Sequence, residues 1–442
     1  MVSSDKLRYM LHSLPDADAT EVSVLCGGEG PYIHDTQGRR YLDAVSGVWN
    51  VSLGYGRADL VAAADAQMRR LAYGSTYAGF ANVPALALAE EISKIVYSSL
   101  NSTYFTASGA DANEVAVKTA RFYWHRHGRP AKTKLLGLDH GFYGTTLAMI
   151  SASGLPAFRS GFGPRLPGFY TVPAPYPYRC DFARNNESPG AAAVRELERI
   201  ILKEDAETIA ALIVEPVQGS AGVIVPPDDY LPAVREICTR HDILLISDEI
   251  ITGFGRTGEW FAMTHWDTEP DIVSFGKGVT SGYLPLGGMV VSDKIADVIR
   301  SGTGENKWVH SSTFSGHAVS CAVALQVLKS IGDERLVDRS KELGAHLLEA
   351  LQDGLPSHVV GEVRGAGLMV GVELVADPVS RAPLHPSLRV GDRVRGKAQK
   401  SGVLVRSSGN TINLAPPFVC SPADIKTIVD VLREAITEVV DL

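Results

Sequence analysis

The chain has 442 residues, of which 45% are hydrophobic and 21% charged, and its formal net charge is -8. This length exceeds what one small core needs, so we expect two domains. The lysines and arginines form no basic block, which argues against binding to nucleic acid or to an anionic membrane surface. The five cysteines are scattered and lack CxxC spacing, which argues against a disulfide framework or a zinc site and indicates reduced thiols.

The first residues, MVSSDKLRYMLHSLPDADATE, contain no apolar core of a secretory signal. No later segment reaches the run of about 18 apolar residues that a transmembrane helix requires. We therefore expect a cytoplasmic protein.

The pattern of apolar residues predicts an α/β fold. After an irregular start, YIHDTQGRRYLDA predicts a hairpin that turns at residues 36–38, and residues 60–71 have the period of an amphipathic helix. The middle of the chain then alternates short apolar runs with helical stretches, as in a mostly parallel sheet. The expected strands are Leu135–Leu138, Ala211–Val214, Ile243–Ile246 and Ile272–Phe275, and the helices include Ala191–Ile201 and Leu231–Arg240.

Two further regions complete the predicted organisation. Residues 172–190 are rich in proline and polar side chains and are too long for a simple connection, which indicates a surface or active-site loop. From Phe314 onward, two helices and two strands indicate a separate α+β lobe. These elements are expected at residues 318–331, 337–355, 369–374 and 411–414.

We therefore expect a large domain with a mostly parallel sheet between helices, together with a smaller α+β domain. The predicted large domain spans residues 66–314, and the predicted small domain spans residues 315–442. Residues 1–65 are expected to contribute to the small domain and to the active site.

The residues that best indicate a chemistry follow two of the apolar runs. Asp248 stands in ILLISDEIITGFGRTG and Lys277 in DIVSFGKGVTSGYLPLGG. Functional groups of α/β folds gather at the carboxyl ends of strands, so these two residues can meet in space. A Schiff-base amine and a carboxylate for a pyridinium nitrogen together suggest pyridoxal 5'-phosphate. A surface lysine and a loop or helix cap are the alternatives that the geometry leaves open.

A second pattern predicts the start of a helix. Ser108 and Asp111 follow the strand-like run Thr103–Thr106, precede the helical stretch Ala112–Phe122 and fit a capping box. The backbone N–H groups at such a helix start carry partial positive charge, which favours a phosphate. A well-capped helix without a ligand is the alternative.

Two other patterns have weaker support. GFGRTG at residues 253–258 satisfies GxGxxG, but the following EWFAMTHWD lacks a helical period, which argues against a dinucleotide site. His310 and His317 lack a third ligand nearby in the sequence, so we expect no metal.

Several stretches of the chain resemble class III aminotransferases, the ω-aminotransferase branch of the fold-type I pyridoxal-phosphate enzymes. The two signature stretches are SDEIITGFGRTG and FGKGVTSGYLPLGG. The likeness continues through DAVSGVWNVSLGYGR, TASGADANEVAVKTAR, DHGFYGTT, EPVQGSAGVIVPP, HSSTFSGH and VLVRSSGNTINLAPP, and it covers roughly residues 30–420 in family order. The resemblance implies fold type I, pyridoxal 5'-phosphate as cofactor and a homodimer with shared active sites.

The resemblance also implies roles for individual residues. Lys277 corresponds to the lysine that holds the cofactor and moves the proton, and Asp248 corresponds to the partner of the ring nitrogen. The other implied cofactor contacts are Ser108, Gly109 and Ala110 at the phosphate, Phe142 and Ile250 on the two ring faces, and Thr313 reaching the phosphate from the neighbouring subunit. The chain departs from the family at Ala110, commonly serine, at Asp111, commonly glutamate, and at Tyr143, usually histidine.

For the substrates, the resemblance implies that Arg406 binds the carboxylate of the acceptor. Ser220 and Ile251 stand where ornithine and γ-aminobutyrate aminotransferases have a glutamate and a glutamine. These departures favour the branch that moves an amino group from an amine or ω-amino acid to a keto acid such as pyruvate, by a ping-pong mechanism through pyridoxamine phosphate. Trp49 and Tyr77 are the candidate pocket aromatics.

Other functions stay open at this point. A diaminopelargonate-type aminotransferase shares much of the pattern, and an amino-sugar or secondary-metabolite substrate is compatible with it. Different classes of function would be a non-catalytic scaffold that binds pyridoxal phosphate and a nicotinamide oxidoreductase. The absorbance of the cofactor would separate these classes.

Overall fold

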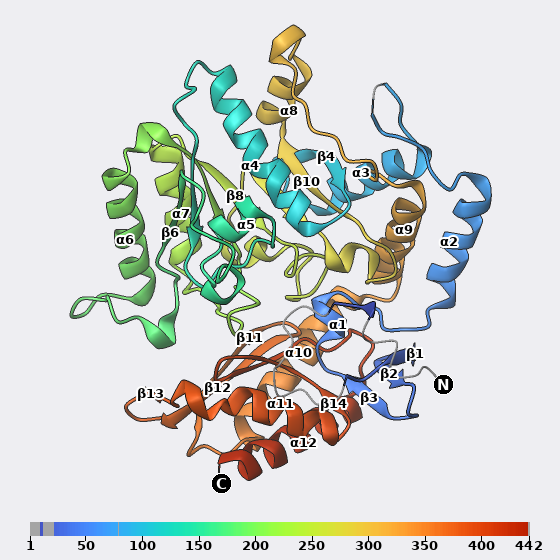
Figure 1. Ribbon diagram of the computed structural model, residues 1–442, viewed down its shortest axis with the longest axis vertical. Helices are drawn as coiled ribbons and strands as arrows, with labels where there is room; N and C mark the ends of the chain where they lie inside the picture. The colour runs from blue at the N-terminus through green and yellow to red at the C-terminus, as the bar shows by residue number, and fades with distance from the viewer. Residues whose placement is uncertain (1–8, 12–21, 78, 441–442) are drawn as a thin grey trace.

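The computed structural model describes residues 9–11, 22–77 and 79–440 of the chain. Figure 1 shows two lobes, a larger one that carries the central sheet and a smaller one that contains both the first strands and the last helix. In the described ranges, no helix is long and apolar enough to cross a membrane. The predicted cytoplasmic location stays a prediction.

The large lobe is built on a seven-stranded sheet in the order β4-β10-β9-β8-β7-β5-β6. β10 pairs antiparallel with β4 and β9 while the other pairs of strands are parallel, so the predicted mostly parallel sheet is confirmed. The strands are β4 (Leu100–Thr106), β5 (Lys134–Leu138), β6 (Phe169–Val172), β7 (Ile209–Val214), β8 (Leu244–Asp248), β9 (Ile272–Phe275) and β10 (Gly287–Ser292).

Helices cover both faces of this sheet because alternate side chains of its strands point to opposite faces. Leu212 and Val214 of β7 belong to one core with α3, α6 and α7, whereas Ala211 and Ile213 belong to a second core with α4, α5 and α8. Apolar runs buried on both sides have this continuous pattern. The helices are α3 (Val83–Ile95), α4 (Gly109–Arg126), α5 (Leu147–Ala152), α6 (Pro189–Lys203), α7 (Tyr230–Arg240) and α8 (Asp293–Arg300).

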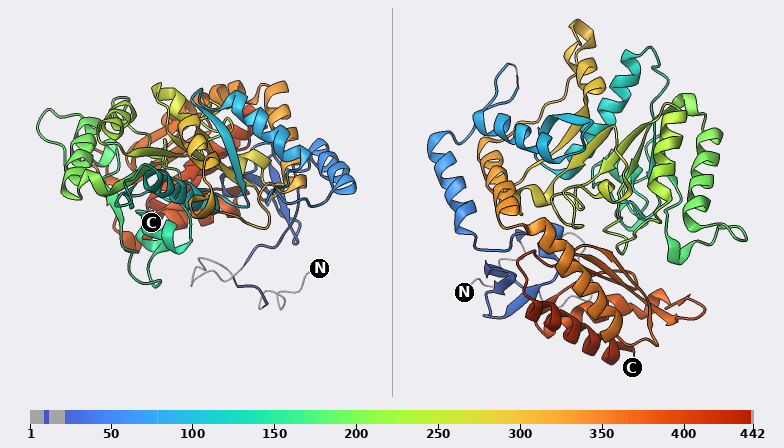
Figure 2. Two further views of the ribbon diagram at one scale, coloured as in Figure 1. Left: turned by 90° about the horizontal axis from the view of Figure 1, so that it is seen from above. Right: turned by 180° about the vertical axis from the view of Figure 1, so that it is seen from behind.

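The small lobe combines both ends of the described chain. Its larger sheet is antiparallel, with the order β11-β12-β16-β15 and with β13 beside β12. In the other sheet, β3 pairs in parallel with β14, so the N-terminal strands lie beside C-terminal elements in Figures 1 and 2. The strands are β1 (Leu25–Glu29), β2 (Tyr32–Asp35), β3 (Arg40–Asp43), β11 (Val360–Ala366), β12 (Met369–Asp377), β13 (Ala382–Pro383), β14 (Val403–Leu404), β15 (Arg406–Ser408) and β16 (Thr411–Leu414), and the helices are α10 (Leu336–Gly354), α11 (Val390–Lys400) and α12 (Pro422–Val440).

Two helices lie at or next to the predicted domain boundaries. Residue 65 lies inside α2 (Ala58–Arg70), and α9 (Ala318–Asp333) packs against α2 and α3 of the large lobe. We therefore propose that the small lobe consists of the segment before α2 together with the chain from α10 onward. Limited proteolysis that released a stable fragment beginning at α9 would contradict this division.

The long loop predicted at residues 172–190 joins β6 to α6 and connects the lobes. Its Tyr176 hydroxyl donates a hydrogen bond to Glu373 of β12, and Arg179 Nε donates to Glu373 Oε1 at 2.7 Å. These contacts fix the loop against the face of the small lobe that turns toward the large lobe.

Candidate active site

A cavity of about 210 Å³ lies where β8 and β9 end and where α4 begins. The carboxyl ends of parallel strands meet at one edge of a sheet, which explains why residues distant in the chain converge here. The residues that line the cavity are Gly109, Ala110, Phe142, Tyr143, Gly144, Thr145, Glu215, Asp248, Ile250, Ile251 and Lys277.

Asp248 is the last residue of β8 and is buried in the wall of the cavity. Its Oδ1 accepts a hydrogen bond from the backbone N–H of Ile250 at 3.0 Å, and its Oδ2 accepts one from Asn113 Nδ2 at 2.7 Å. Asn113 is itself oriented by Ser274, whose hydroxyl donates to Asn113 Oδ1 at 2.5 Å. The carboxylate therefore has a fixed orientation before any ligand binds.

Asn113 was absent from the residues predicted from the sequence. It lies one helical turn after Gly109 in α4, and its buried neighbours Ala112, Val115 and Ala116 are apolar. The sequence did contain one signal for Asn113, namely a single amide side chain on an apolar helix face. A buried polar group of this kind needs hydrogen-bond partners.

Lys277 begins a short 3-10 helix directly after β9. Its backbone φ is +41°, a left-handed conformation that costs a non-glycine residue free energy and that concentrates at functional sites. Burial lowers the pKa of the Lys277 amine, while Asp248 and Glu215 counteract this shift. The amine therefore loses its proton more readily than an exposed lysine.

Glu215 adds a second buried carboxyl group, which the sequence interpretation did not single out. Its Oε1 accepts from the backbone N–H of Phe142 at 2.8 Å, and its Oε2 accepts from the backbone N–H of Gly219 at 3.1 Å. It thereby fixes two loops at the cavity. The motif EPVQG contained this residue, but nothing in the sequence showed which way its side chain points.

The start of α4 forms another wall of the cavity. Ser108 Oγ accepts from the backbone N–H of Asp111 at 3.2 Å, so the predicted N-cap is confirmed. A Cβ at Gly109 would lie 2.8 Å from Ile250 Cδ1, so a larger residue here would require the Ile250 side chain to move. β8 ends at Asp248, and Ile250 lies in the turn that follows. Ile250 nevertheless lines the cavity.

The adjacent aromatic residues Phe142 and Tyr143 lie in different surroundings. The Phe142 ring lies on the cavity and packs against Phe158, with ring centroids 4.7 Å apart. The Tyr143 hydroxyl points into the core, where it donates to the backbone oxygen of Ile213 at 3.1 Å and accepts from the backbone N–H of Leu138 at 3.0 Å. Its hydroxyl therefore does not set the polarity of the cavity.

Arg406 lies on the small lobe, outside the lining of the cavity. It is half-buried at the start of β15, and its positive charge is among the influences on the pKa of Lys277. On the facing loop, the backbone oxygen of Ser220 accepts from Ser408 Oγ at 2.6 Å, and Gly219 lies against Ile251. Ser220 and Ile251 are therefore placed close to the strand that carries Arg406.

Five predicted residues lie outside the lining of this cavity, namely Ser108, Arg406, Trp49, Tyr77 and Thr313. Trp49 is only 3% exposed and belongs to the main hydrophobic core. Tyr77 is 58% exposed. Thr313 is exposed, and its backbone oxygen accepts from the Tyr73 hydroxyl at 2.9 Å. The roles implied for these residues stay predictions.

The motif considered for a dinucleotide and the histidines considered for a metal make contacts within the protein. Arg256 of GFGRTG is buried and binds across the lobes, donating to the backbone oxygen of Pro416 at 2.7 Å and to Ser46 Oγ at 3.2 Å. The motif opens no helix, as predicted. His310 lies 3.3 Å from Asp111 Oδ1, and His317 caps α9.

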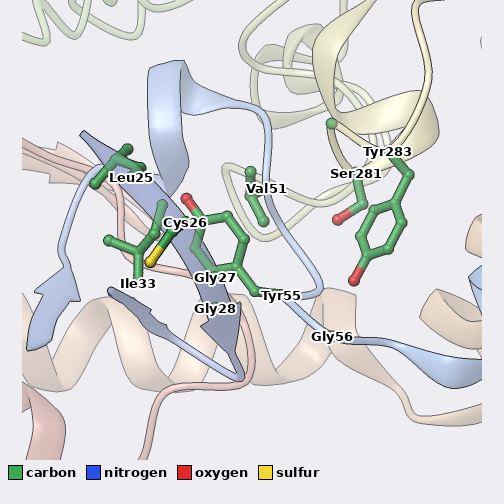
Figure 3. Close-up of a pocket in the computed structure, with 11 residues that line it drawn as sticks. Leu25, Cys26, Gly27, Gly28, Ile33, Val51, Tyr55, Gly56, Ser281 and Tyr283 are labelled. Atoms are coloured by element: carbon green, nitrogen blue, oxygen red, sulfur yellow. The ribbon is translucent and has the colours of Figure 1, made fainter. Parts of the chain in front are cut away.

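A second cavity, of about 440 Å³, lies between the N-terminal strands and the loop after Lys277 (Figure 3). Its described lining contains no charged side chain. The hydroxyl of Tyr55 donates to Asp43 at 2.6 Å, and the hydroxyl of Tyr283 donates to the backbone oxygen of Gly54 at 3.1 Å. Its tyrosines are thus already hydrogen-bonded, whereas Lys277, Asp248 and Glu215 line the first cavity.

The two buried acids predict how the stability of the cofactor-free chain depends on pH. Burial raises the pKa of Glu215 from 4.5 to about 8 and that of Asp248 from 3.8 to about 6. Between these ordinary and raised values the folded chain binds more protons than the unfolded chain, so the free energy of unfolding falls as pH rises. Urea unfolding of the cofactor-free protein at pH 5.5 and pH 8 should show this fall.

The substitution Glu215→Gln tests whether this group is responsible. The variant should show a clearly smaller difference in the free energy of unfolding between the two pH values, because glutamine does not titrate. An unchanged difference would show that Glu215 does not carry the effect.

The cavity joins a lysine amine, a buried oriented carboxylate and the N-terminus of a helix on a mostly parallel sheet. This is the arrangement of a pyridoxal 5'-phosphate enzyme of fold type I, because the amine, the acid and the helix suit the aldehyde, the ring nitrogen and the phosphate of that cofactor.

Comparison with known proteins agrees with this class. Residues 16–436 match the family model for class-III aminotransferases. The chain is 37% identical over 416 residues to the putrescine–pyruvate aminotransferase of Pseudomonas aeruginosa, covering 94% of this chain and 90% of that protein. It is 36% identical to the diaminobutyrate–2-oxoglutarate transaminase of Halomonas elongata, covering 95% and 91% of the two chains. The chain therefore belongs to the class-III aminotransferase family and uses pyridoxal 5'-phosphate.

Solved structures show the same fold. An (S)-enantioselective ω-transaminase from Thermomicrobium roseum superposes with a TM-score of 0.94 at 41% identity, covering 99% of this chain and 98% of that chain. An amine transaminase from an uncultivated Pseudomonas species, solved with pyridoxal phosphate bound, superposes with a TM-score of 0.92 at 39% identity, covering 97% and 98%.

Proposed function

We propose that this aminotransferase moves an amino group from an amine or ω-amino acid to a keto acid such as pyruvate, in two half-reactions that use the same cavity in turn. The observation that carries the proposal is that the charge of Arg406 acts on Lys277 in the cavity, while Ser408 of the same strand binds the backbone oxygen of the neutral residue Ser220. The putrescine–pyruvate aminotransferase among the relatives supports an amine as donor and pyruvate as acceptor.

The residues of the cavity fit the cofactor. When bound, pyridoxal 5'-phosphate supplies an electron sink that makes deprotonation of the substrate carbon feasible. The start of α4 at Gly109 and Ala110 would hold the phosphate, with Phe142 and Ile250 on the two faces of the ring and Asp248 at its nitrogen. Ala110 lies against Gly144, where a Cβ would come within 2.7 Å of the Ala110 methyl group, so the phosphate wall is closely packed.

Lys277 would carry the proton between carbon atoms. Burial favours its neutral amine, and a neutral amine near neutral pH can act as a general base. Its position at the end of β9 keeps the nitrogen inside the cavity, close to Asp248 and Glu215. One side chain can therefore both bind the cofactor covalently and transfer the proton.

Asp248 would keep a proton on the ring nitrogen. The hydrogen bonds from Asn113 and from the backbone of Ile250 stabilise its charged form and aim it in one direction. A positive nitrogen opposite this carboxylate would attract the electrons released at the substrate carbon.

Arg406 would bind the carboxylate of the acceptor, because a planar guanidinium forms two parallel hydrogen bonds to a carboxylate. We expect Arg406→Ala to raise KM for pyruvate by about 10- to 100-fold, in line with the loss of a charge-assisted bidentate pair. KM for an aldehyde acceptor without a carboxylate should change by less than about threefold. Initial rates with both acceptors measure the difference, and equal losses would show that Arg406 is not the carboxylate group's partner.

We propose a homodimer in which Thr313 reaches the cofactor phosphate of the neighbouring copy. Thr313 is exposed and lies outside the lining of the cavity of its own chain, which supports a role on a partner. Exposed Phe314 and Phe80 supply apolar surface for such a contact. Sedimentation of a fully active monomer would contradict this arrangement.

The absorption spectrum of the purified protein tests the proposed function directly. Protein with pyridoxal phosphate should be yellow, and a panel of amines added without an acceptor should remove the visible band and produce a near-ultraviolet band. The amines that do so are donors. A nicotinamide enzyme or an inert scaffold would not respond, and a protein without the yellow band would refute the assignment of the cavity. Parallel double-reciprocal plots of initial rates would support the two alternating half-reactions.

A further inference from the structure

Arg406 lies near the positive charge of Arg395 and near a loop without acidic side chains at residues 216–225. Burial and then the charge of Arg395 lower the pKa of Arg406, and no described carboxylate counteracts them. The loop that faces β15 presents Ser220, whose backbone oxygen is bound by Ser408. On the side of this loop, the guanidinium therefore faces neutral polar groups.

Asn413 stands directly opposite Arg406 in the sheet. The register of β15 and β16 pairs Arg406 with Asn413, and residues paired in this way point to the same face with Cβ atoms about 5 Å apart. Asn413 is 1% exposed. On its other side it faces Gly371 of β12, where a Cβ would lie 2.4 Å from the backbone oxygen of Gly222. The amide is therefore confined between Arg406 and the loop that contains Ser220.

The hydrogen bonds determine which way the Asn413 amide points. Ser408 Oγ donates its single proton to the backbone oxygen of Ser220 at 2.6 Å, so it can only accept from Asn413. Asn413 Nδ2 donates to Ser408 Oγ at 2.8 Å. Asn413 Oδ1 is buried and has no hydrogen-bond partner in the described structure. A buried acceptor without a donor is unfavourable and uncommon.

We propose that Asn413 is a specificity-determining residue whose Oδ1 can accept a hydrogen bond from the Arg406 guanidinium when that side chain turns toward β16, in competition with the carboxylate of a substrate. An arginine has only donors, and rotation of its side chain about its own bonds brings them to a neighbour across the strand pair. This proposal rests on the proposed function, in which Arg406 binds the acceptor carboxylate.

The neutrality of Asn413 explains how it would act. An amide holds the guanidinium in a defined position without cancelling its charge, so an incoming carboxylate can replace the amide as the partner of Arg406. A carboxylate at position 413 would instead form an ion pair and compete with the substrate. Removing the hydrogen-bonding amide of residue 413 altogether would leave the substrate carboxylate without a competitor for Arg406.

Two substitutions of Asn413 therefore have opposite expected effects on the binding of propanoate, the carboxylate that resembles pyruvate without its keto group. With Asn413→Asp, the inhibition constant of propanoate should rise by about tenfold or more, because a charge lies close to the guanidinium. With Asn413→Leu, it should fall by about twofold to fivefold, because one competing hydrogen bond is lost. KM for pyruvate should follow the same directions in both variants while kcat at saturating pyruvate stays unchanged.

Asn410→Asp is the matched control, since it makes the same change on the same hairpin, where Asn410 Nδ2 binds the backbone oxygen of Leu384 instead. The control should leave propanoate inhibition within about twofold of the unsubstituted enzyme, because the new charge lies in the turn of the hairpin and not opposite Arg406. A purely structural role for Asn413 would move propanoate binding in the same direction in both Asn413 variants, and this result, or no change in either, would overturn the proposal.

Arg406→Ala separates this proposal from the assignment on which it rests. If Arg406→Ala leaves propanoate inhibition unchanged, Arg406 does not bind carboxylates, and both ideas fail. If Arg406→Ala weakens propanoate while the Asn413 variants do not differ from each other, only the role of Asn413 is wrong.

Discussion

Replacement of Lys277 by alanine should abolish transamination, with kcat lower by at least about 10³-fold, because the variant loses both the covalent attachment and the base that moves the proton. Pyridoxal phosphate should still bind through the start of α4 and the two ring faces. Amine–pyruvate turnover measures the first expectation, and the cofactor content of the gel-filtered variant measures the second.

Lys426→Ala is a suitable control for this experiment. Lys426 is exposed on α12 and pairs with Asp430, far along the chain from the cavity, so its loss should change turnover little. If the Lys277 variant kept near-normal turnover, the assignment of the cavity as the active site would be wrong.

The substitution Asp248→Asn is expected to have the second-largest effect, a fall in kcat of about 10²-fold or more, because proton-holding groups of this kind contribute about that much. Asparagine keeps the volume of the side chain but cannot stabilise a positive ring nitrogen. It also brings an amide NH₂ group against Asn113 Nδ2 or the backbone N–H of Ile250, both of which are donors. The pH dependence of the visible cofactor band should therefore change together with kcat.

The neighbouring residue provides a contrasting variant. Glu249 is also buried, but its carboxylate accepts from Thr252 Oγ1 at 2.6 Å and from the backbone N–H of Ala262 at 2.9 Å, and it does not line the cavity. Glu249→Gln should lower the melting temperature while the cofactor band keeps its pH dependence. A variant of Glu249 that altered the band as much as Asp248→Asn would show that the effect is not specific to Asp248.

Much of the fold was predictable because its strands are buried on both faces. Runs such as Ala211–Val214 are apolar throughout, and Val214 and Ile213 serve different cores on the two sides of one strand. The residue at which such a strand ends is harder to predict. The predicted strand Ile243–Ile246 extends in the structure to Asp248, because polar residues at the sheet edge still pair with the next strand.

Domain boundaries were harder to predict because nothing in the sequence of helix α9 shows which lobe it packs against. Its apolar residues suit any core, and only the structure shows that they pack against α2 and α3. The same limit applies to the site. Asp248 and Lys277 were found from their motifs, whereas Asn113, Glu215 and Asn413 matter through the direction of a side chain and through partners distant in the chain.

The antiparallel strand β10 has a consequence for the motion of the enzyme. The chain from Lys277 returns directly into β10, which is hydrogen-bonded to β9 and β4, so both ends of the segment that carries the lysine are anchored in one sheet. Asp248 ends the adjacent strand of that sheet. Arg406, by contrast, belongs to the other lobe. A hinge movement between the lobes would therefore change the distance from Arg406 to the Lys277 amine, while Lys277 and Asp248 kept their spacing. Substrate binding at Arg406 could then change without any change in the geometry of proton transfer.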